Sequence, residues 1–256
     1  MSALVRQERE KSLLHFARFE FKYILPKKLR DEVESHLVNF LQLDPFVASK
    51  VNHKYIVRSL YYDDPHYSAF HDKIDGLHTR SKFRIRTYSD EIVDQAPFFL
   101  ELKGRNNNLV FKHRTPVTFE GRDWPFLRGD AFTSAILRNG IPSRVLDQFE
   151  FKVLKNGIKP VALIDYQRRP YISKYDPTFR ITFDEKITAF NSDNIFPESR
   201  DQCRDVLSGF TVLEVKFHHH MPSWFHRVIQ TYQLKRVSIS KICAGMEVLG
   251  LAHDEN

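Results

Sequence analysis

The chain has 256 residues, of which 42% are hydrophobic, and it carries a formal net charge of +7 at pH 7. This apolar content, with 22 Phe and 10 Tyr, supplies a folded core and argues against a disordered chain. The excess of cations favours an anionic partner, and two cysteines are too few for a disulfide framework. No run reaches the roughly 20 apolar residues of a membrane span, so we expect a soluble, cytoplasmic protein.

The first third of the chain alternates between helical and strand patterns. Weak amphipathicity predicts a helical N-terminal extension over residues 1–15. Strict alternation of charged and apolar residues predicts a strand over 16–25. Apolar residues at helical spacing then predict a helix from 27 to about 43. A second strand is expected over 55–62, followed by a short helix over 66–74.

The strongest pattern of the sequence lies between Arg80 and Val117, where we predict three strands. Each strand sets charged residues on one face and apolar residues on the other, because successive side chains point to opposite faces. Neighbouring strands lie about 4.8 Å apart, so the charged rows stack into one surface. Such a surface repels itself unless an anion binds it. The charged residues of the three rows are Lys82, Arg84, Arg86, Glu101, Lys103, Lys112 and Arg114.

The second half of the chain continues with a mixture of helices and strands. Helical periodicity over 122–157 predicts two helices, broken at 140–142 by a Gly-Ile-Pro sequence. Further strands and helices follow to the end of the chain. We predict strands over 160–166, 179–187 and 211–218, and helices over 198–207, from Pro222 onward and over 238–249.

Positive charge is concentrated on the predicted strand faces. Twelve cations on or beside these faces outnumber four acids (Glu20, Glu101, Asp184 and Glu214), an excess of eight against +7 for the whole chain. An antiparallel sandwich with solvated charged faces is one interpretation. The bias towards Lys and Arg favours a second interpretation, in which the charged rows line a tunnel. The twelve cations are Arg18, Lys22, Lys82, Arg84, Arg86, Lys103, Lys112, Arg114, Arg168, Arg180, Lys216 and Lys241.

We therefore predict an α+β fold, a closed antiparallel β-barrel of about eight strands with a tunnel lined by basic residues and amphipathic helices packed outside. The domain is expected to span 16–250, with 251–256 as a tail. Guanidinium and ammonium groups pair with phosphate oxygens, and the carboxylates Glu20, Glu101 and Glu214 suit Mn²⁺ or Mg²⁺. Asp184 is expected to orient Arg180 or a neighbouring cation. The residues predict a polyanion with a divalent metal and name no reaction.

Eight short motifs occur in order along the chain and resemble the VTC domain. This is the catalytic domain of the polyphosphate polymerase in the vacuolar transporter chaperone complex, within the triphosphate tunnel metalloenzyme superfamily. The resemblance runs from about Phe16 to Gly245. Its motifs are Arg18-x-Glu20-x-Lys22, Ser59-x-Tyr61-Tyr62-Asp63, Arg84-x-Arg86, Glu101-x-Lys103, Lys112-x-Arg114, Tyr166-x-Arg168, Arg180 and Glu214-x-Lys216.

The resemblance implies roles for individual residues. Glu214 matches the metal-binding glutamate of the family, and Glu20 and Glu101 are further metal candidates. Cations that would grip the reacting phosphates are Lys22, Arg84, Arg86, Lys103, Lys112, Arg168 and Arg180. Residues expected to bind the rest of the substrate are Arg18, Ser59, Tyr61, Lys82, Arg114, Lys216 and Lys241.

The resemblance also implies a reaction: transfer of the ATP γ-phosphate to pyrophosphate or polyphosphate. Arg18 stands where the hydrolase branch carries a glutamate, which favours the polymerase branch, whereas Ser238 replaces a second lysine of family polymerases. The sensing and membrane domains that accompany the family domain have no counterpart here, so we expect a free-standing, bacterial form, compatible with a membrane partner. Two alternatives stay open: a triphosphatase or nucleotide hydrolase, and a non-catalytic module for polyphosphate or inositol phosphates. Nucleic acid is disfavoured, because most aromatics lie on the face opposite the cations.

Overall fold

The computed structural model describes residues 19–92, 96–107, 109–119, 124–199, 201–218 and 220–253, and the predicted helix over 1–15 and Arg18 lie outside these ranges. Within them the fold is α+β and is built on one antiparallel sheet of ten strands. The path of hydrogen-bonded neighbours is β1-β10-β8-β7-β3-β4-β5-β6, with β2 added to β7 and β9 to β8. The strands are β1 (Phe19–Pro26), β2 (Leu41–Leu43), β3 (Tyr55–Asp63), β4 (Thr79–Thr87), β5 (Phe98–Asn106), β6 (Leu109–Val117), β7 (Lys159–Ser173), β8 (Arg180–Phe190), β9 (Cys203–Val206) and β10 (Phe210–Phe217).

Seven α-helices accompany the sheet in the described part of the chain. Their ends follow local sequence signals: the Ser143 side chain accepts a hydrogen bond at the start of α6, and Gly157 ends α6 with a φ of 63°. No described helix is long and apolar enough to cross a membrane. The helices are α2 (Lys27–Leu37), α3 (Pro45–Ala48), α4 (Ser68–Ile74), α5 (Gly129–Asn139), α6 (Arg144–Asn156), α7 (Ser223–Thr231) and α8 (Lys241–Val248).

Two predicted helices are wrong in part or in full. The helix expected over 27–43 ends at Leu37, and residues 41–43 form β2, which pairs with the far end of β7. The helix expected over 198–207 is replaced by β9. Both short strands pair with the exposed edges of β7 and β8, which run well beyond their predicted ends. Tertiary pairing thus overrides local helical spacing at both places.

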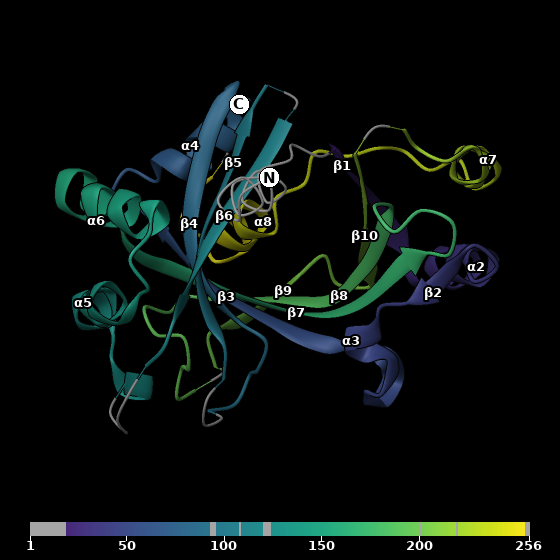
Figure 1. Ribbon diagram of the computed structural model, residues 1–256. Helices are drawn as coiled ribbons and strands as arrows, with labels where there is room; N and C mark the ends of the chain where they lie inside the picture. The colour runs from purple at the N-terminus through teal and green to yellow at the C-terminus, as the bar shows by residue number, and fades with distance from the viewer. Residues whose placement is uncertain are drawn as a thin grey trace, which may run out of the picture.

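The predicted closed barrel is not confirmed. The sheet curves so that β4, β5 and β6 rise on one side and β1 and β10 on the other (Figure 1). Cα atoms of β1 and β6 approach within 8 Å, yet no backbone ladder joins these two strands among the described residues. Instead the ammonium group of Lys103 on β5 donates a hydrogen bond to Glu20 on β1 at 3.1 Å. Side chains, not backbone bonds, therefore span the gap.

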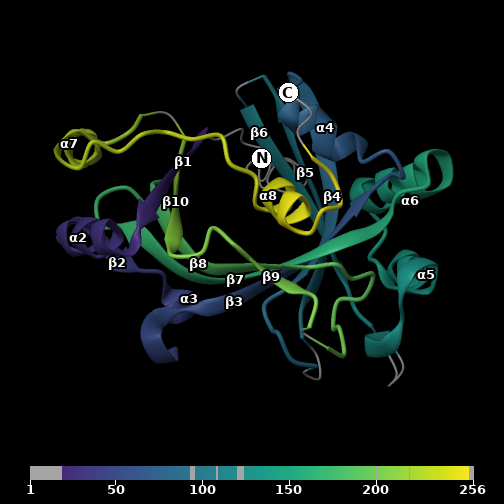
Figure 2. The same ribbon diagram turned by 180° about the vertical axis from the view of Figure 1, so that it is seen from behind.

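Helices cover both faces of the sheet, contrary to the prediction that all helices pack outside. On the outer face, α5 and α6 cover one half of the sheet and α2 and α7 cover the other, each over a separate apolar cluster. On the inner face α8 lies inside the curve, as both views show (Figures 1 and 2). Ile242 and Met246 of α8 pack against Tyr61, Ile164 and other inner-face residues. That end of the inner face is apolar, so it buries a helix.

Candidate functional site

The charged residues on the inner face form three clusters, each built around buried carboxylates. Strand register brings them together: Arg84 on β4 lies opposite Glu101 on β5, and Glu101 lies opposite Arg114 on β6. On the other side of the curve, Lys22 on β1 lies opposite Glu214 on β10. Cross-strand neighbours stand about 4.5–5.5 Å apart, so each row of the sequence pattern meets the next. The alternation seen in sequence thus produces one continuous charged surface.

Glu101 holds the first cluster and is fully buried, with an exposed fraction of 0%. Its Oε2 accepts a hydrogen bond from Arg84 Nε at 2.8 Å and lies 3.6 Å from Arg86 Nη1. Its other oxygen contacts the ammonium group of Lys112. Burial alone would raise the pKa of Glu101, but the three cations outweigh it and hold that pKa well below its ordinary value. Glu101 is therefore a fixed anion that positions three cations.

The cations of this cluster have further anchors on β3 and β7. Arg84 Nη1 donates to the hydroxyl of Tyr61 at 2.7 Å, and Arg86 Nε donates to Ser59 Oγ at 3.0 Å. Arg86 Nη2 also reaches the Tyr166 hydroxyl at 3.4 Å. Burial alone would raise the pKa of Tyr61, but Arg84, Arg86 and Lys82 lower it to about 8. The hydroxyl groups fix the guanidinium planes.

Glu20 joins the second cluster on β1. Its carboxylate accepts hydrogen bonds from Lys103 at 3.1 and 3.2 Å and lies 3.6 Å from Lys22 Nζ. Lys22 also lies 3.8 Å from Glu214, so two carboxylates converge on one ammonium group. Burial alone would raise the pKa of Glu20, but Lys103 and other nearby lysines outweigh burial, so this pKa lies well below its ordinary value. The negative charge of Glu20 is therefore permanent at neutral pH.

Glu214 and Asp184 form the third cluster, at the junction of β8, β10 and α8. Arg168 donates two hydrogen bonds of 2.6 Å to Asp184, in a fork-to-fork pair, and a third of 3.2 Å to Glu214. Lys241, at the start of α8, lies 2.7 Å from both carboxylates. Burial would lower the pKa of Lys241, but the two carboxylates raise it far above its ordinary value. Lys241 thus ties α8 to the floor of the site.

Three lysines face each other across adjacent strands: Lys82, Lys103 and Lys112. Like charges directly opposite repel. Burial is the largest cause that lowers the pKa of each, and neighbouring cations add to it. For Lys112 the pKa falls to about 7. Lys82 Nζ donates to Ser240 Oγ at 2.9 Å and has no carboxylate partner among the described residues. This lysine row is the part of the site that most favours an anion.

The remaining predicted residues lie at the edge of this surface or beyond it. Lys216 lies 3.0 Å from Glu214 and belongs to the third cluster. Arg114 is exposed and covers the ring of Phe99 at 4.7 Å. The side chain of Arg180 is 52% exposed and its Nη1 is 3.9 Å from Asp44, so Asp184 orients Arg168 and not Arg180.

Sequence reasoning missed the role of Tyr166, whose hydroxyl supports Arg86, whereas the expectation that Asp184 orients a cation holds for Arg168. Strand alternation could have placed both residues on the charged face, because Tyr166 is two residues from Arg168 and Asp184 alternates with Thr182 and Arg180. The buried Thr182 hydroxyl, on that face, has no hydrogen-bond partner among the described residues. These groups complete the polar lining of β7 and β8.

The positive excess survives folding. Four buried carboxylates (Glu20, Glu101, Asp184 and Glu214) face nine buried or half-buried cations. Below pH 7, where Lys112 is charged, the described site therefore carries five positive charges beyond the carboxylates. In a region partly shielded from water, such an excess costs free energy that an anionic ligand would recover. The nine cations are Lys22, Lys82, Arg84, Arg86, Lys103, Lys112, Arg168, Lys216 and Lys241.

The carboxylates differ in their fitness for a divalent metal. No group of three or more His, Cys, Asp or Glu side chains gathers among the described residues to hold a metal ion alone. Glu20 and Glu214 nevertheless converge on Lys22, and the negative charge of Glu214 is one of the causes that raise the pKa of Glu20. Two carboxylates with substrate phosphates suit Mg²⁺ or Mn²⁺. Glu101 fits poorly, because three cations already occupy its oxygens.

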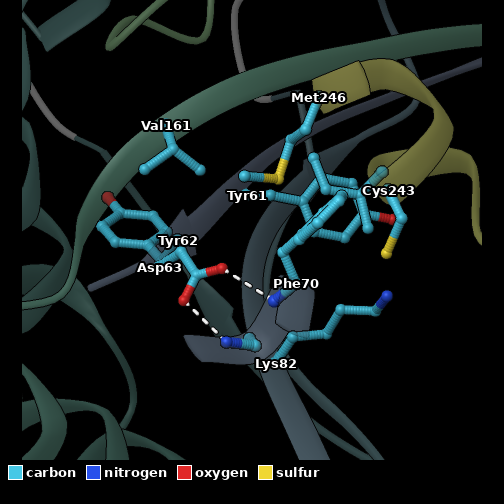
Figure 3. Close-up of a pocket in the computed structure, with 10 residues that line it drawn as sticks. Tyr61, Tyr62, Asp63, Phe70, Lys82, Val161, Cys243 and Met246 are labelled. Atoms are coloured by element: carbon cyan, nitrogen blue, oxygen red, sulfur yellow. Dashed lines mark hydrogen bonds between the residues drawn. The ribbon is translucent and has the colours of Figure 1, made fainter. Parts of the chain in front are cut away.

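A small cavity lies between the end of β3, α4 and α8 (Figure 3). Asp63 accepts hydrogen bonds from the backbone of Ala69 and Phe70 at 2.9 and 3.1 Å, which fixes the start of α4. Phe70, Cys243 and Met246 make the rest of the cavity largely apolar, with Lys82 at its margin. This cavity is mostly apolar, and Tyr61 and Lys82 are the residues that it shares with the charged surface.

Comparison with known proteins gives a likeness in fold to solved structures and a match of the sequence to one family model. The chain is similar to a putative adenylate cyclase from Bacillus halodurans at 13% identity, with a TM-score of 0.51 over 88% of this chain and 94% of that one. It is also similar to the PH1819 protein from Pyrococcus horikoshii at 12% identity, with a TM-score of 0.47 over 90% of this chain and 98% of that one. No curated protein sequence matches significantly. The family model of the VTC domain matches residues 17–250, and the chain belongs to the VTC domain family.

Proposed function

We propose that the protein is a metal-dependent polyphosphate polymerase that transfers the γ-phosphate of ATP to pyrophosphate or polyphosphate. The observation that carries the proposal is the excess of five positive charges over the buried carboxylates on the inner face. Membership of the VTC domain family and the likeness in fold to the putative adenylate cyclase support a triphosphate-binding enzyme. We propose one catalytic unit over residues 16–250.

The residues of the site divide the work of phosphoryl transfer. The bond between the γ-phosphorus and its bridging oxygen to ADP breaks, and a terminal oxygen of the acceptor chain forms the new bond. The acceptor is already anionic, so it needs little help from a base. Catalysis then rests on position and on charge. Arg84 and Arg86, held in place by Glu101, would contact equatorial oxygens of the transferring group, and Lys103 and Lys112 would neutralise the neighbouring phosphates.

Glu20 and Glu214 are the groups that would hold Mn²⁺ or Mg²⁺. Held there, such an ion would supply positive charge to offset that of the substrate phosphates. Lys22 lies within 4 Å of both carboxylates and competes for the same oxygens. Lys22 would contact the substrate phosphates beside these two carboxylates. The role of Lys241 is then to keep Glu214 and Asp184 charged and in place.

A triphosphatase is the second candidate. If the acceptor were excluded, water would attack the γ-phosphate at the same cations, so the two reactions would use the same cation clusters. A non-catalytic binding module for polyphosphate or inositol phosphates is the third. Loss of the Glu214 charge separates enzyme from module, because it removes a metal ligand without removing a cation.

The test follows both products from ATP, Mn²⁺ and a pyrophosphate primer. The parent and Lys152→Ala, which removes an exposed lysine on α6, are expected to make gel-resolved chains, whereas Arg84→Ala and Glu214→Gln are not. Glu214→Gln is expected to retain polyphosphate binding. Free phosphate without chains overturns the polymerase in favour of the triphosphatase. Tight binding with neither product overturns both enzymes.

A further inference from the structure

A group of aromatic rings crosses one end of the inner face, beyond the last cations of the rows. Its members are Phe46 on α3, Tyr55 on β3, Tyr88 directly after β4, and Phe99 on β5. Ring centroids are 5.1 Å apart for Phe46 and Tyr55, 5.7 Å for Tyr55 and Tyr88, and 6.1 Å for Tyr88 and Phe99. We call this band the aromatic rim. It departs from the general alternation, in which aromatics point to the outer face.

The aromatic rim continues the charged rows and shares their face. Tyr88 follows Arg86 by two residues, and Phe99 precedes Glu101 by two, so each lies on the same side of its strand as the charged neighbour. Tyr55 lies opposite Arg168 in the strand register. Burial, the largest cause, raises the pKa of Tyr55 to about 12, so the hydroxyl beside Arg168 stays neutral. The rim is thus an apolar extension of the anion site.

Along β4 the aromatic rim lies at the end away from the contact with Ser240, although Tyr55 and Tyr88 also pack against the apolar cluster that includes α8. Along β4, Lys82 contacts Ser240 next to α8, then come Arg84 and Arg86, and Tyr88 follows at the far end. Helix α8 lies inside the curve, beside β4 and β5 (Figure 2). The order along β4 is therefore the contact with Ser240 before α8, the cations and the aromatic rim.

The rings of the aromatic rim are not sealed in the core. Phe46 is 53% exposed, and Tyr55, Tyr88 and Phe99 are half-buried. Cations flank both ends of the band: Lys50 lies 4.8 Å from the ring centre of Phe46, and Arg114 lies over Phe99. Aromatic rings beside cations, at the edge of a surface that attracts phosphate, form the surroundings in which bases stack.

We propose that the aromatic rim binds the base of a purine nucleoside triphosphate whose phosphates lie among the inner-face cations. The proposal rests on the placement of the phosphates in the proposed function. On the rise of a strand, Tyr88 lies about 7 Å from Arg86 and about 13 Å from Arg84. An extended nucleotide spans such a distance between its base and its terminal phosphates. The rim therefore recognises the nucleotide donor and leaves the inorganic chain, which has no base, to the cations.

This placement predicts a class of donor. Stacking contributes about 1–3 kcal/mol per base and tolerates differences in the base edge. Purines offer the larger ring surface, so ATP and GTP are expected to bind similarly and more tightly than CTP and UTP. Affinity for tripolyphosphate is independent of the rim.

The experiment compares calorimetric dissociation constants of ATP and tripolyphosphate for the parent and for rim variants. Phe46→Ala and Tyr88→Ala are each expected to weaken ATP binding roughly 5- to 150-fold, the stacking contribution of one base. The dissociation constant of tripolyphosphate should change by less than about twofold, because this ligand has no base to stack on the rings. Tyr88→Phe, which keeps the ring, should retain the parent affinity for ATP. Phe151→Ala, which removes an equally exposed ring on α6, is the matched control.

The outcomes separate this inference from the proposed function. Selective loss of ATP binding supports the rim whether or not polyphosphate is made. Equal loss of both ligands, or no loss of ATP binding, overturns the rim even if the polymerase is active. A parent that binds neither ligand overturns the rim together with the placement of the phosphates.

Discussion

Removing the charge of Glu101 should destabilise the empty protein strongly and make its stability unusually dependent on anions. In Glu101→Gln, Arg84, Arg86 and Lys112 would face one another around a neutral amide that is fully buried. Breaking a buried ion pair from one side costs about 3–5 kcal/mol. For a chain of this size each kcal/mol lowers Tm by about 2–4 °C, so the expected fall is about 6–20 °C.

The second half of this prediction tests whether the cations form a ligand site. Tripolyphosphate would restore negative charge between the three cations, so it should raise the Tm of Glu101→Gln by more than it raises that of the parent. The matched control is Asp165→Asn on the outer face. In the parent, the buried Arg58 donates three hydrogen bonds to Asp165, and the variant removes the negative charge of that pair. That variant should lose stability comparably and gain no additional rescue from the anion.

Thermal and urea unfolding, with and without tripolyphosphate, measure both effects. A loss below about 1 kcal/mol for Glu101→Gln without anion would show that the carboxylate does not organise the cations, since the buried-pair estimate is several-fold larger. Equal anion rescue of Glu101→Gln and Asp165→Asn would refute the assignment of the cluster to the ligand site.

Two further predictions concern proton binding and packing. The pKa of Lys112 is lowered to about 7, so its charge is present below that pH and lost above it. Tripolyphosphate affinity should therefore fall between pH 6 and 8 in the parent, and this fall should be absent in Lys112→Ala. A fall that persists in the variant contradicts the assignment. Folding depresses this lysine pKa, so the associated cost to stability is present below pH 7 and is relieved as the pH rises towards 10.5. Gly245→Ala should lower the free energy of unfolding in urea by about 1–3 kcal/mol, because a Cβ there would lie 2.5 Å from Ile164 Cδ1. Val248→Ala, on the exposed side of α8, should change it by no more than about 0.5 kcal/mol. Equal effects would show that α8 does not pack closely on β7.

The sequence predicted those features that depend on local period. Alternation placed Arg84, Arg86 and Glu101 on one strand face, and that parity holds in β4 and β5. Helix ends were predicted where a local signal exists, as at Gly157. Pairing partners were beyond reach, because β2 and β9 are short segments whose strand form depends on the edges of β7 and β8.

The inner position of α8 and the exact partners of each carboxylate also required three dimensions. An amphipathic helix pattern does not say which face of a sheet it covers, and the apolar patch under α8 is assembled from five strands. Likewise the bond between Asp184 and Arg168 follows from strand register and not from spacing along the chain. Arg180 has the right parity, but it lies at the very start of β8, where its side chain reaches solvent.

Calorimetric titration of tripolyphosphate tests most directly whether the inner-face cations form a specific site for a phosphate chain. Lys103→Ala removes a half-buried cation of the lysine row, and Lys152→Ala removes the same charge from the outer surface. A charge-assisted hydrogen bond contributes about 1.5–3 kcal/mol, so Lys103→Ala should weaken binding roughly 10- to 150-fold while Lys152→Ala leaves it unchanged. Equal weakening by the two variants would mean that net charge alone attracts the anion, and it would contradict the site.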